Sequence, residues 1–159
     1  MELNLEVDPE SAAMIELNVL RSPGREEFTR IAFFKDGGFL ADRQGLAFPA
    51  KGRTAPPKVV PWSTRSSLVV LDSSCSSLHP DVKYRAPSAA SVLLEPNERL
   101  RLRLFIDKSV VEVFVNERQV MAERVFPSRD DSLGVSLRAQ GNRAELKSLE
   151  AWQMKSIYP

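Results

Sequence analysis

Residues 99–119 read RLRLRLFIDKSVVEVFVNERQ, and this stretch decides the fold class. Leucine alternates with arginine in its first half, and valine recurs at every second position in its second half. A strand places successive side chains on opposite faces, so this alternation gives each half one apolar and one polar face. The Asp-Lys-Ser break at 107–109 supplies residues typical of a turn. The stretch therefore predicts a tight hairpin of two half-buried antiparallel strands.

The same two-residue period recurs along the chain. Alternating apolar residues also occupy 2–7, 14–20, 28–34 and 133–139. Turn-forming residues separate the runs at 22–26, 35–38, 95–98, 116–118, 128–131 and 140–142. Strands at roughly ten-residue spacing with short connections are typical of an all-β sandwich or barrel. We expect a two-sheet antiparallel β-sandwich of the lectin-like or jelly-roll-like kind.

Two segments interrupt this rhythm. Residues 44–66 contain four prolines. Because proline cannot donate to a sheet ladder, we expect a long surface loop there, with at most a short edge strand around 58–60. Residues 72–77, DSSCSS, predict a second polar loop. No internal repeat or linker is visible, and the length is ordinary for one domain, so 1–159 is predicted to be a single β-sandwich domain.

The composition narrows the class of protein. The chain is 43% hydrophobic and 27% charged, with a net charge of +1. These values are ordinary for a soluble globular protein and give no electrostatic bias toward nucleic acid or an anionic membrane. The opening MELNLEVDPES lacks the apolar block of a signal peptide, and no apolar run approaches the ~20 residues of a membrane-spanning helix. With Cys75 as its single cysteine, the chain has no intrachain disulfide. We expect no metal and no cofactor, and the compartment stays open.

Two carboxylates in the hairpin raise the question of catalysis. Asp107 and Glu112 lie five residues apart, and a retaining glycosidase needs two carboxyl groups about 5 Å apart in a pocket. The sequence indicates neither the pocket nor a third group to position them. We therefore interpret Asp107 as a turn residue and Glu112 as a residue of the solvent face or of an interface. A Cys75/His79 pair lacks support in the same way, and His79 is interpreted as a loop residue.

The remaining candidates are arginines and aromatic residues. The three arginines of 99–103 form a basic stripe. We interpret it as a solvated strand face rather than a phosphate-binding surface. Trp62 and Tyr84 are the carbohydrate-binding candidates, since sugars stack their C–H faces on aromatic rings. Trp152 falls in the last expected strand, where we expect it in the core or at a seam between domains.

The segments 102–119 (LRLFIDKSVVEVFVNERQ) and 124–157 (RVFPSRDDSLGVSLRAQGNRAELKSLEAWQMKSI) resemble a known module. They are similar to the C-terminal β-sandwich of glycoside hydrolase family 32, which contains invertases, levanases and other β-fructofuranosidases. Family sequences have an Ile-Asp-Arg-Ser hairpin, a Glu-Val-Phe strand and an Asn turn. They continue with a strand ending in Tyr-Pro or Phe-Pro and a last strand ending in Trp and Met. Residues 15–33 and 68–81 fit earlier strands of the same module.

The resemblance implies an accessory role without catalysis. In family 32 the reaction takes place in an N-terminal five-bladed propeller, which carries Asn-Asp-Pro-Asn-like, Glu-Cys and Arg-Asp-Pro motifs. None of these motifs occurs in this chain. The nearest sequences are Asp8-Pro9, Ser74-Cys75 and Arg129-Asp130-Asp131. The chain is therefore expected to be a non-catalytic module of a sucrose- or fructan-cleaving enzyme that stabilises the catalytic propeller or mediates assembly.

A module of this kind implies a partner. Without the propeller it should expose an apolar surface, which a propeller domain, a separate propeller chain or a second copy of the chain would cover. Trp152 and Glu112 are the candidate residues of that domain interface. The alternative function is a free-standing carbohydrate-binding module that uses Trp62 and Tyr84 to bind fructan or another sugar.

Overall fold

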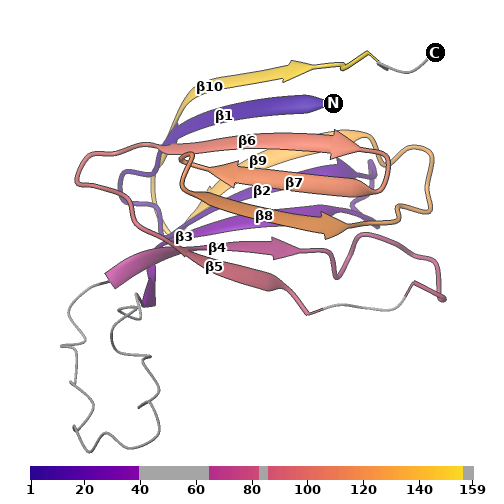
Figure 1. Ribbon diagram of the computed structural model, residues 1–159, viewed down its shortest axis with the longest axis horizontal. Helices are drawn as coiled ribbons and strands as arrows, with labels where there is room; N and C mark the ends of the chain where they lie inside the picture. The colour runs from indigo at the N-terminus through magenta and orange to yellow at the C-terminus, as the bar shows by residue number, and fades with distance from the viewer. Residues whose placement is uncertain (40–64, 83–85, 156–159) are drawn as a thin grey trace, which may run out of the picture.

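The computed structural model describes residues 1–39, 65–82 and 86–155, and its regular structure there is β-strand throughout (Figure 1). The strands of this described part are β1 Glu2–Asp8, β2 Met14–Arg21, β3 Thr29–Phe39, β4 Arg65–Asp72, β5 Ser88–Val92, β6 Leu100–Asp107, β7 Val110–Val115, β8 Gln119–Arg124, β9 Gly134–Gln140 and β10 Glu145–Trp152. The predicted proline-rich loop lies outside the described residues, apart from its last two positions, which begin β4.

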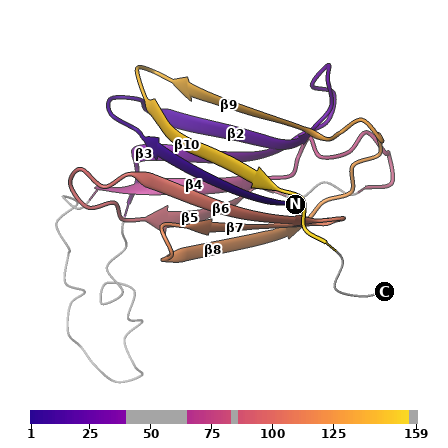
Figure 2. The same ribbon diagram turned by 90° about the horizontal axis from the view of Figure 1, so that it is seen from above.

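The strands form two antiparallel sheets of five strands each, packed face to face (Figure 2). The first sheet has the order β10-β1-β6-β7-β8, and the second has the order β5-β4-β3-β2-β9. The prediction of a two-sheet antiparallel β-sandwich is therefore confirmed. Each sheet turns one set of alternate side chains toward the other sheet and the second set toward its own outer face.

The core lies between the sheets and consists of the aliphatic residues that the alternation predicted. In β6, Leu100, Leu102 and Leu104 are at most 3% exposed, whereas the arginines between them are exposed. In β3 of the facing sheet, Ile31 and Phe33 are each 1% exposed. Burying a side chain of this size contributes roughly 1.5–3 kcal/mol. The alternating pattern thus provides most of the driving force for folding.

The hairpin predicted for 99–119 is present. β6 and β7 pair antiparallel from Leu102↔Val115 to Asp107↔Val110. Lys108, between the strands, has a φ of 49°, in the left-handed region that tight hairpin turns need. Asp107 ends β6 and is exposed, in agreement with its interpretation as a hairpin residue.

Asn116 fixes the other end of β7. Its φ is 47° and it is only 8% exposed. The side chain accepts a hydrogen bond from the Arg101 backbone N–H (2.9 Å). It donates to the Arg99 backbone oxygen (2.8 Å) and to Glu98 Oε1 (3.0 Å). One amide therefore ties the end of β7 to the beginning of β6.

We expect Asn116→Ala to lower the free energy of unfolding by about 2–3 kcal/mol, because three hydrogen bonds and a residue tolerant of positive φ are lost. Urea unfolding measures this. Asn97→Ala is the matched control, since Asn97 has a φ of 65° and is exposed. Its side chain makes no hydrogen bond within the described residues, so only the backbone cost of about 1 kcal/mol is expected. Equal losses in the two variants would contradict the role of the amide.

Residues 35–38, predicted to be a turn, lie inside β3 instead. The pairing of β3 with β4 shifts register between Phe34 and Gly38, and Asp36 has a φ of 52°. The Lys-Asp-Gly-Gly sequence therefore forms a β-bulge rather than a chain reversal. The prediction was wrong because a bulge needs the same backbone-tolerant residues as a turn.

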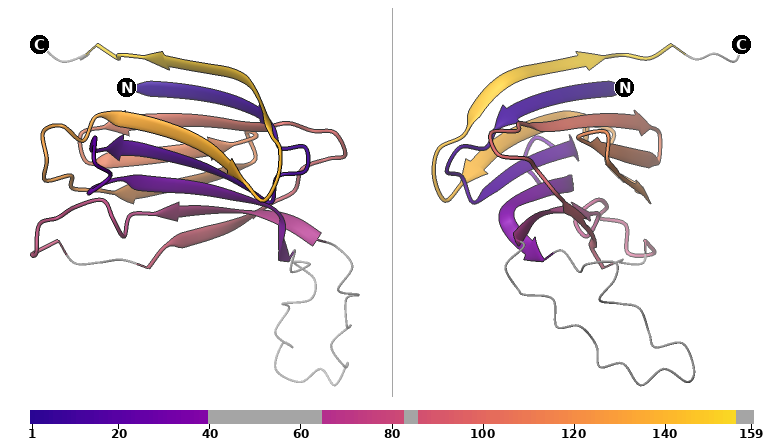
Figure 3. Two further views of the ribbon diagram at one scale, coloured as in Figure 1. Left: turned by 180° about the vertical axis from the view of Figure 1, so that it is seen from behind. Right: turned by 60° about the vertical axis from the view of Figure 1, so that its left-hand side comes forward.

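The sandwich is closed along one side. There, β8 of the first sheet lies against β4 and β5 of the second. The Ser88 hydroxyl donates a hydrogen bond to Glu123 Oε1 at 2.7 Å, which joins the two edge strands. On the opposite side, β9 and β10 are the outermost strands of their sheets (Figures 2 and 3).

This opposite side leaves apolar side chains uncovered. All eight residues of β10 are exposed. Leu146 and Leu149, which pair with core-facing residues of β1, are 48% and 44% exposed. Leu133, just before β9, is 78% exposed and Val135 is 37% exposed, although the alternation predicted burial for both. That prediction was wrong because alternation shows which face of a strand is apolar but not whether another part of the chain covers that face. These four side chains are called the open rim below.

Glu27 lies in the β2–β3 connection and is 0% exposed. Its hydrogen bonds join this connection to the β4–β5 and β8–β9 connections at one end of the sandwich. Its carboxylate accepts hydrogen bonds from Leu78 N (2.8 Å), Ser128 N (3.0 Å), Arg129 N (3.1 Å) and Ser132 Oγ (2.8 Å), and from the Ser128 hydroxyl. Figure 1 shows the β4–β5 and β8–β9 connections together at this end. Burial alone would raise the pKa of Glu27, but these donors outweigh it and lower the pKa from 4.5 to about 2.

A second buried carboxylate, Glu16, lies on the outer face of the second sheet and is also 0% exposed. Arg138 donates two hydrogen bonds to it (3.0 and 2.8 Å), and Arg25 donates one at 3.2 Å. Arg30 forms a longer ion pair at 4.0 Å, and Asn18 donates at 2.9 Å. Burial would raise the pKa of Glu16, but the hydrogen bonds from Arg138 and Asn18 and the nearby arginine charges lower it.

Candidate functional site

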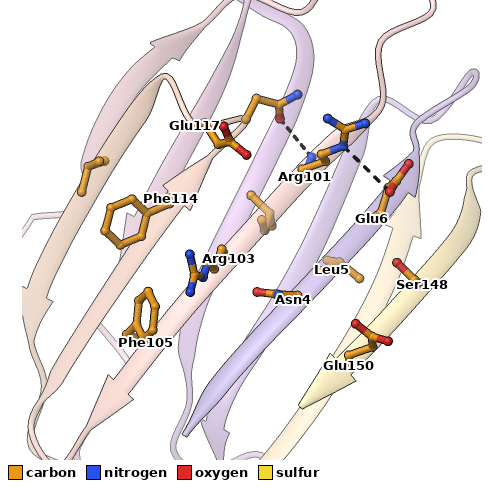
Figure 4. A pocket seen from close by; sticks show the side chains of 13 residues that line it. Asn4, Leu5, Glu6, Arg101, Arg103, Phe105, Phe114, Glu117, Ser148 and Glu150 are labelled. Carbon is orange, nitrogen blue, oxygen red and sulfur yellow. Dashed lines mark hydrogen bonds and ion pairs between the residues drawn. The ribbon is translucent and has the colours of Figure 1, made fainter. Parts of the chain in front are cut away.

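A hollow of about 570 Å³ opens on the outer face of the first sheet (Figure 4). On one side it is lined by Phe105, Phe114 and Val120 of β6, β7 and β8. On the other side it is lined by charged and amide side chains of β1, β6 and β10. The volume falls in the range of small-molecule sites. We call it the outer hollow.

Strand register explains why these side chains meet. Residues directly opposite one another in adjacent antiparallel strands have Cβ atoms about 5 Å apart. One such row crosses the whole sheet through Glu150, Asn4, Arg103, Phe114 and Val120. The next row crosses it through Trp152, Glu2, Phe105, Glu112 and Ala122. The hollow thus combines residues from both ends of the chain on a rigid sheet.

The three arginines of the stripe at 99–103 form ion pairs with two carboxylates of β1. Arg99 lies 2.7 Å and Arg101 lies 3.8 Å from the Glu6 carboxylate, and Arg103 lies 2.7 Å from Glu2. The hydrogen bond from Arg99, together with the arginine charges, lowers the pKa of Glu6. All three guanidinium side chains are exposed. The interpretation of the stripe as a solvated strand face is therefore confirmed.

Two phenylalanine rings form the apolar side of the outer hollow. Phe105 and Phe114 meet edge to face, with ring centroids 5.8 Å apart and an interplanar angle of 87°. The Arg103 guanidinium lies 4.8 Å from the centroid of Phe105 and covers that ring. Among the described residues no cation covers Phe114, which is half-buried in the lining. Phe114 is therefore the ring that remains free for a ligand.

Several polar groups of the outer hollow keep unused bonding capacity. The side chains of Glu117 and Glu150 have neither a hydrogen bond nor an ion pair within the described residues. The Oδ1 atom of Asn4, between Arg103 and Glu150 in the row, is buried without a hydrogen-bond donor. An unpaired buried acceptor is unfavourable by about 1–3 kcal/mol. These acceptors give the hollow capacity to bind a ligand that donates hydrogen bonds.

Four residues were predicted to bind carbohydrate or to form a domain interface, and the structure describes two of them. Trp62 and Tyr84 lie outside the described residues, so their role in carbohydrate binding stays a prediction. Trp152 is 45% exposed on β10, which excludes the core as its position in this chain. Glu112 is half-buried on β7. Both lie in one row of the outer face with Phe105 between them, and their role at a domain interface stays a prediction.

The outer hollow itself could not be predicted from the sequence. The alternation in β6 and β7 marks Arg103, Phe105 and Phe114 as outward-facing residues. It does not reveal that β1 and β10 lie beside β6, which brings Asn4 and Glu150 to the same place. Only knowledge of the strand order would have identified the site.

The other candidate residues form no second site within the described residues. Over residues 1–39, 65–82 and 86–155, no three His, Cys, Asp or Glu side chains come together in a way that could hold a metal ion. Cys75 is a half-buried free thiol. The His79 Nδ1 atom lies 3.8 Å from the Asp81 Oδ2 atom. In the same residues no helix has the length and hydropathy needed to cross a membrane.

The family model described as "Glycosyl hydrolases family 32 C terminal" matches residues 1–153. The chain belongs to this family. This match confirms the resemblance drawn from the sequence, which is most specific over 100–157 and looser over 1–95. The β-sandwich described above is the C-terminal module of family 32.

Comparison with individual proteins places this family 32 module within longer chains. A levanase of Bacillus subtilis (strain 168) is 36% identical over 63 residues, which are 39% of this chain and 9% of the levanase. The structure of fructan 1-exohydrolase IIa from Cichorium intybus has a TM-score of 0.69 at 17% identity, covering 97% of this chain and 30% of that one. Exo-inulinase from Aspergillus awamori has a TM-score of 0.59 at 18% identity, covering 93% and 23%. The chain thus spans less than a third of each of these relatives, and the two structures share its fold.

Proposed function

We propose that this family 32 C-terminal domain is a non-catalytic accessory module of a β-fructofuranosidase-type hydrolase. The parent enzyme would cleave sucrose or fructans, and the module would stabilise the catalytic propeller or mediate its assembly. Family membership supports this, as do relatives named levanase, exo-inulinase and fructan exohydrolase, of which this chain covers only the smaller part.

The open rim is the observation that carries the proposal. Leu133, Val135, Leu146 and Leu149 expose apolar surface where the two sheets are not closed. Apolar surface of this kind favours association with a partner. β10 also presents an edge whose backbone groups pair with no other strand of the described chain, and such an edge favours association too. The exposed Trp152 lies on the same strand.

The test is association with a family 32 catalytic propeller produced as a separate chain. We expect the two chains to coelute in size-exclusion chromatography and the propeller to unfold at a higher temperature in the complex, because binding stabilises the folded state. Leu149→Asp should abolish both effects, since it places a charge in an apolar interface.

Leu93→Asp is the matched control, because Leu93 is 45% exposed and follows β5, the strand at the opposite edge of its sheet from β9. It should leave association unchanged. A chain that scatters as a monodisperse monomer and binds no propeller would contradict the accessory role. Release of fructose from sucrose by the isolated chain would contradict its non-catalytic character.

A further inference from the structure

We propose that the outer hollow is a binding site for a neutral oligosaccharide, with Phe114 as the ring on which a sugar unit stacks. The choice of sugar rests on the proposed function, which makes a β-linked fructo-oligosaccharide the expected ligand. The site is separate from the open rim, because it lies on the outer face of the first sheet rather than between the sheets.

The first support is the shape of the site. A volume of about 570 Å³ accommodates a short oligosaccharide. The lining residues come from the five hydrogen-bonded strands of one sheet and from the β7–β8 turn, so the hollow exists before any ligand arrives. A preformed site on rigid strands loses little conformational entropy on binding.

The second support is the arrangement of apolar and polar groups. A sugar has apolar C–H faces and a rim of hydroxyl groups that both donate and accept hydrogen bonds. The outer hollow places the uncovered Phe114 ring on one side, with the Glu117 carboxylate of the β7–β8 turn on that same side, and the Glu150 carboxylate of β10 on the other. Asn4 Oδ1 adds a third acceptor that has no donor in the described chain. Hydroxyl groups would supply the donors that these oxygens lack.

The charges of the site favour a neutral ligand. Arg103 pairs with Glu2 at 2.7 Å, and Arg101 lies 3.8 Å from Glu6, which also pairs with Arg99. The lining contains three carboxylates, of Glu6, Glu117 and Glu150, against these two guanidinium groups. The groups left unpaired are carboxylates, which would repel an anion. A neutral polyol carries no charge, so the carboxylates do not repel it. They accept its hydroxyl hydrogens in charge-assisted hydrogen bonds.

The experiment is an NMR titration of the 15N-labelled chain with 1-kestose, with maltotriose as the comparison sugar. We expect 1-kestose to shift the backbone amide signals of residues around the outer hollow and to leave those of the second sheet unchanged. Phe114→Leu should weaken binding roughly tenfold, because it removes the flat ring and keeps an apolar side chain. The unliganded spectrum of the variant shows whether the fold is retained, and Glu150→Gln provides a second variant that keeps the shape of the site.

Phe126→Leu is the matched control. Phe126 is a 43% exposed ring with the Arg124 guanidinium 5.3 Å from its centroid, and it is not part of the hollow. This variant should bind 1-kestose as the unmodified chain does. Equal shifts with maltotriose would overturn the assignment to fructosides, and shifts scattered outside the hollow would overturn the site. If Phe114→Leu weakens association with a propeller while the sugar titration is silent, the face is a protein interface. That outcome would reject this inference and leave the accessory function intact.

Discussion

Replacing Glu27 by glutamine is expected to lower the free energy of unfolding by about 3–5 kcal/mol. The charged carboxylate accepts hydrogen bonds from the backbone N–H groups of Leu78, Ser128 and Arg129, and from two serine hydroxyls. Glutamine has nearly the same shape, but its NH2 group would face donors instead of accepting from them. Buried N–H groups would then lose their acceptor, and the three connections would separate at that end of the sandwich.

Urea unfolding of Glu27→Gln measures this loss. Asp130→Asn is the matched control, since Asp130 lies in the same β8–β9 connection but is exposed. The same exchange of a carboxylate for an amide should change stability by less than about 0.5 kcal/mol at this surface position. Comparable losses in both variants would show that the effect comes from the loop sequence and not from the buried carboxylate.

Glu27 also predicts how stability depends on pH. Its pKa is about 2 in the folded chain, below the ordinary value of 4.5. A carboxyl group whose pKa is lowered by folding stabilises the protein fully above the unfolded pKa and loses this contribution as the pH falls toward the folded pKa. Unfolding free energy should therefore decline between about pH 4.5 and pH 2. The decline should be shallower in Glu27→Gln, and an unchanged pH profile in this variant would contradict the assignment.

Glu16→Gln is expected to be similarly damaging, with a loss of about 3–5 kcal/mol. The substitution removes the buried negative charge between Arg25, Arg30 and Arg138, and leaves three guanidinium groups facing one another. Asp72 pairs with Arg30 and compensates only part of that positive charge. The repulsion would act on β2, β3 and β9 together.

A double-mutant cycle tests the origin of this loss. Adding Arg138→Gln to Glu16→Gln removes one of the three cations, so the double variant should be more stable than the sum of the two single losses predicts. Glu6→Gln is the control on the opposite sheet, where the carboxylate also pairs with arginines but lies at the surface. It should have little effect, because surface ion pairs contribute little. Strict additivity in the cycle would contradict direct coupling between Glu16 and Arg138.

The fold class follows from the sequence because its cause is local. Alternation in β1, β2, β6 and β7 decides which side chains face inward, and two sheets are the simplest way to bury them. The predictions from sequence failed where burial or backbone conformation depends on neighbouring strands. Leu133 and Val135 alternate as core residues do, yet they are exposed at the edge of the second sheet. The bulge around Asp36 has the composition of a turn.

The sites were less predictable than the fold, because their members come from distant parts of the chain. Glu27 finds its partners about 50 and 100 residues later, and nothing in its local sequence distinguishes it from the neighbouring Glu26. The outer hollow joins Asn4 to Glu150. Only strand order and register, which depend on the whole fold, bring these residues together.

The position of β1 has a consequence for the order in which the chain can fold. β1 lies between β6 and β10, and its pairing with β10 joins Glu2 to Trp152. Within this module β1 is synthesised before both of its hydrogen-bonding neighbours, β6 and β10. Contacts of such long sequence separation slow folding, and an unpaired apolar strand is prone to aggregation while it waits. The nascent module therefore depends on its final strand to complete the first sheet.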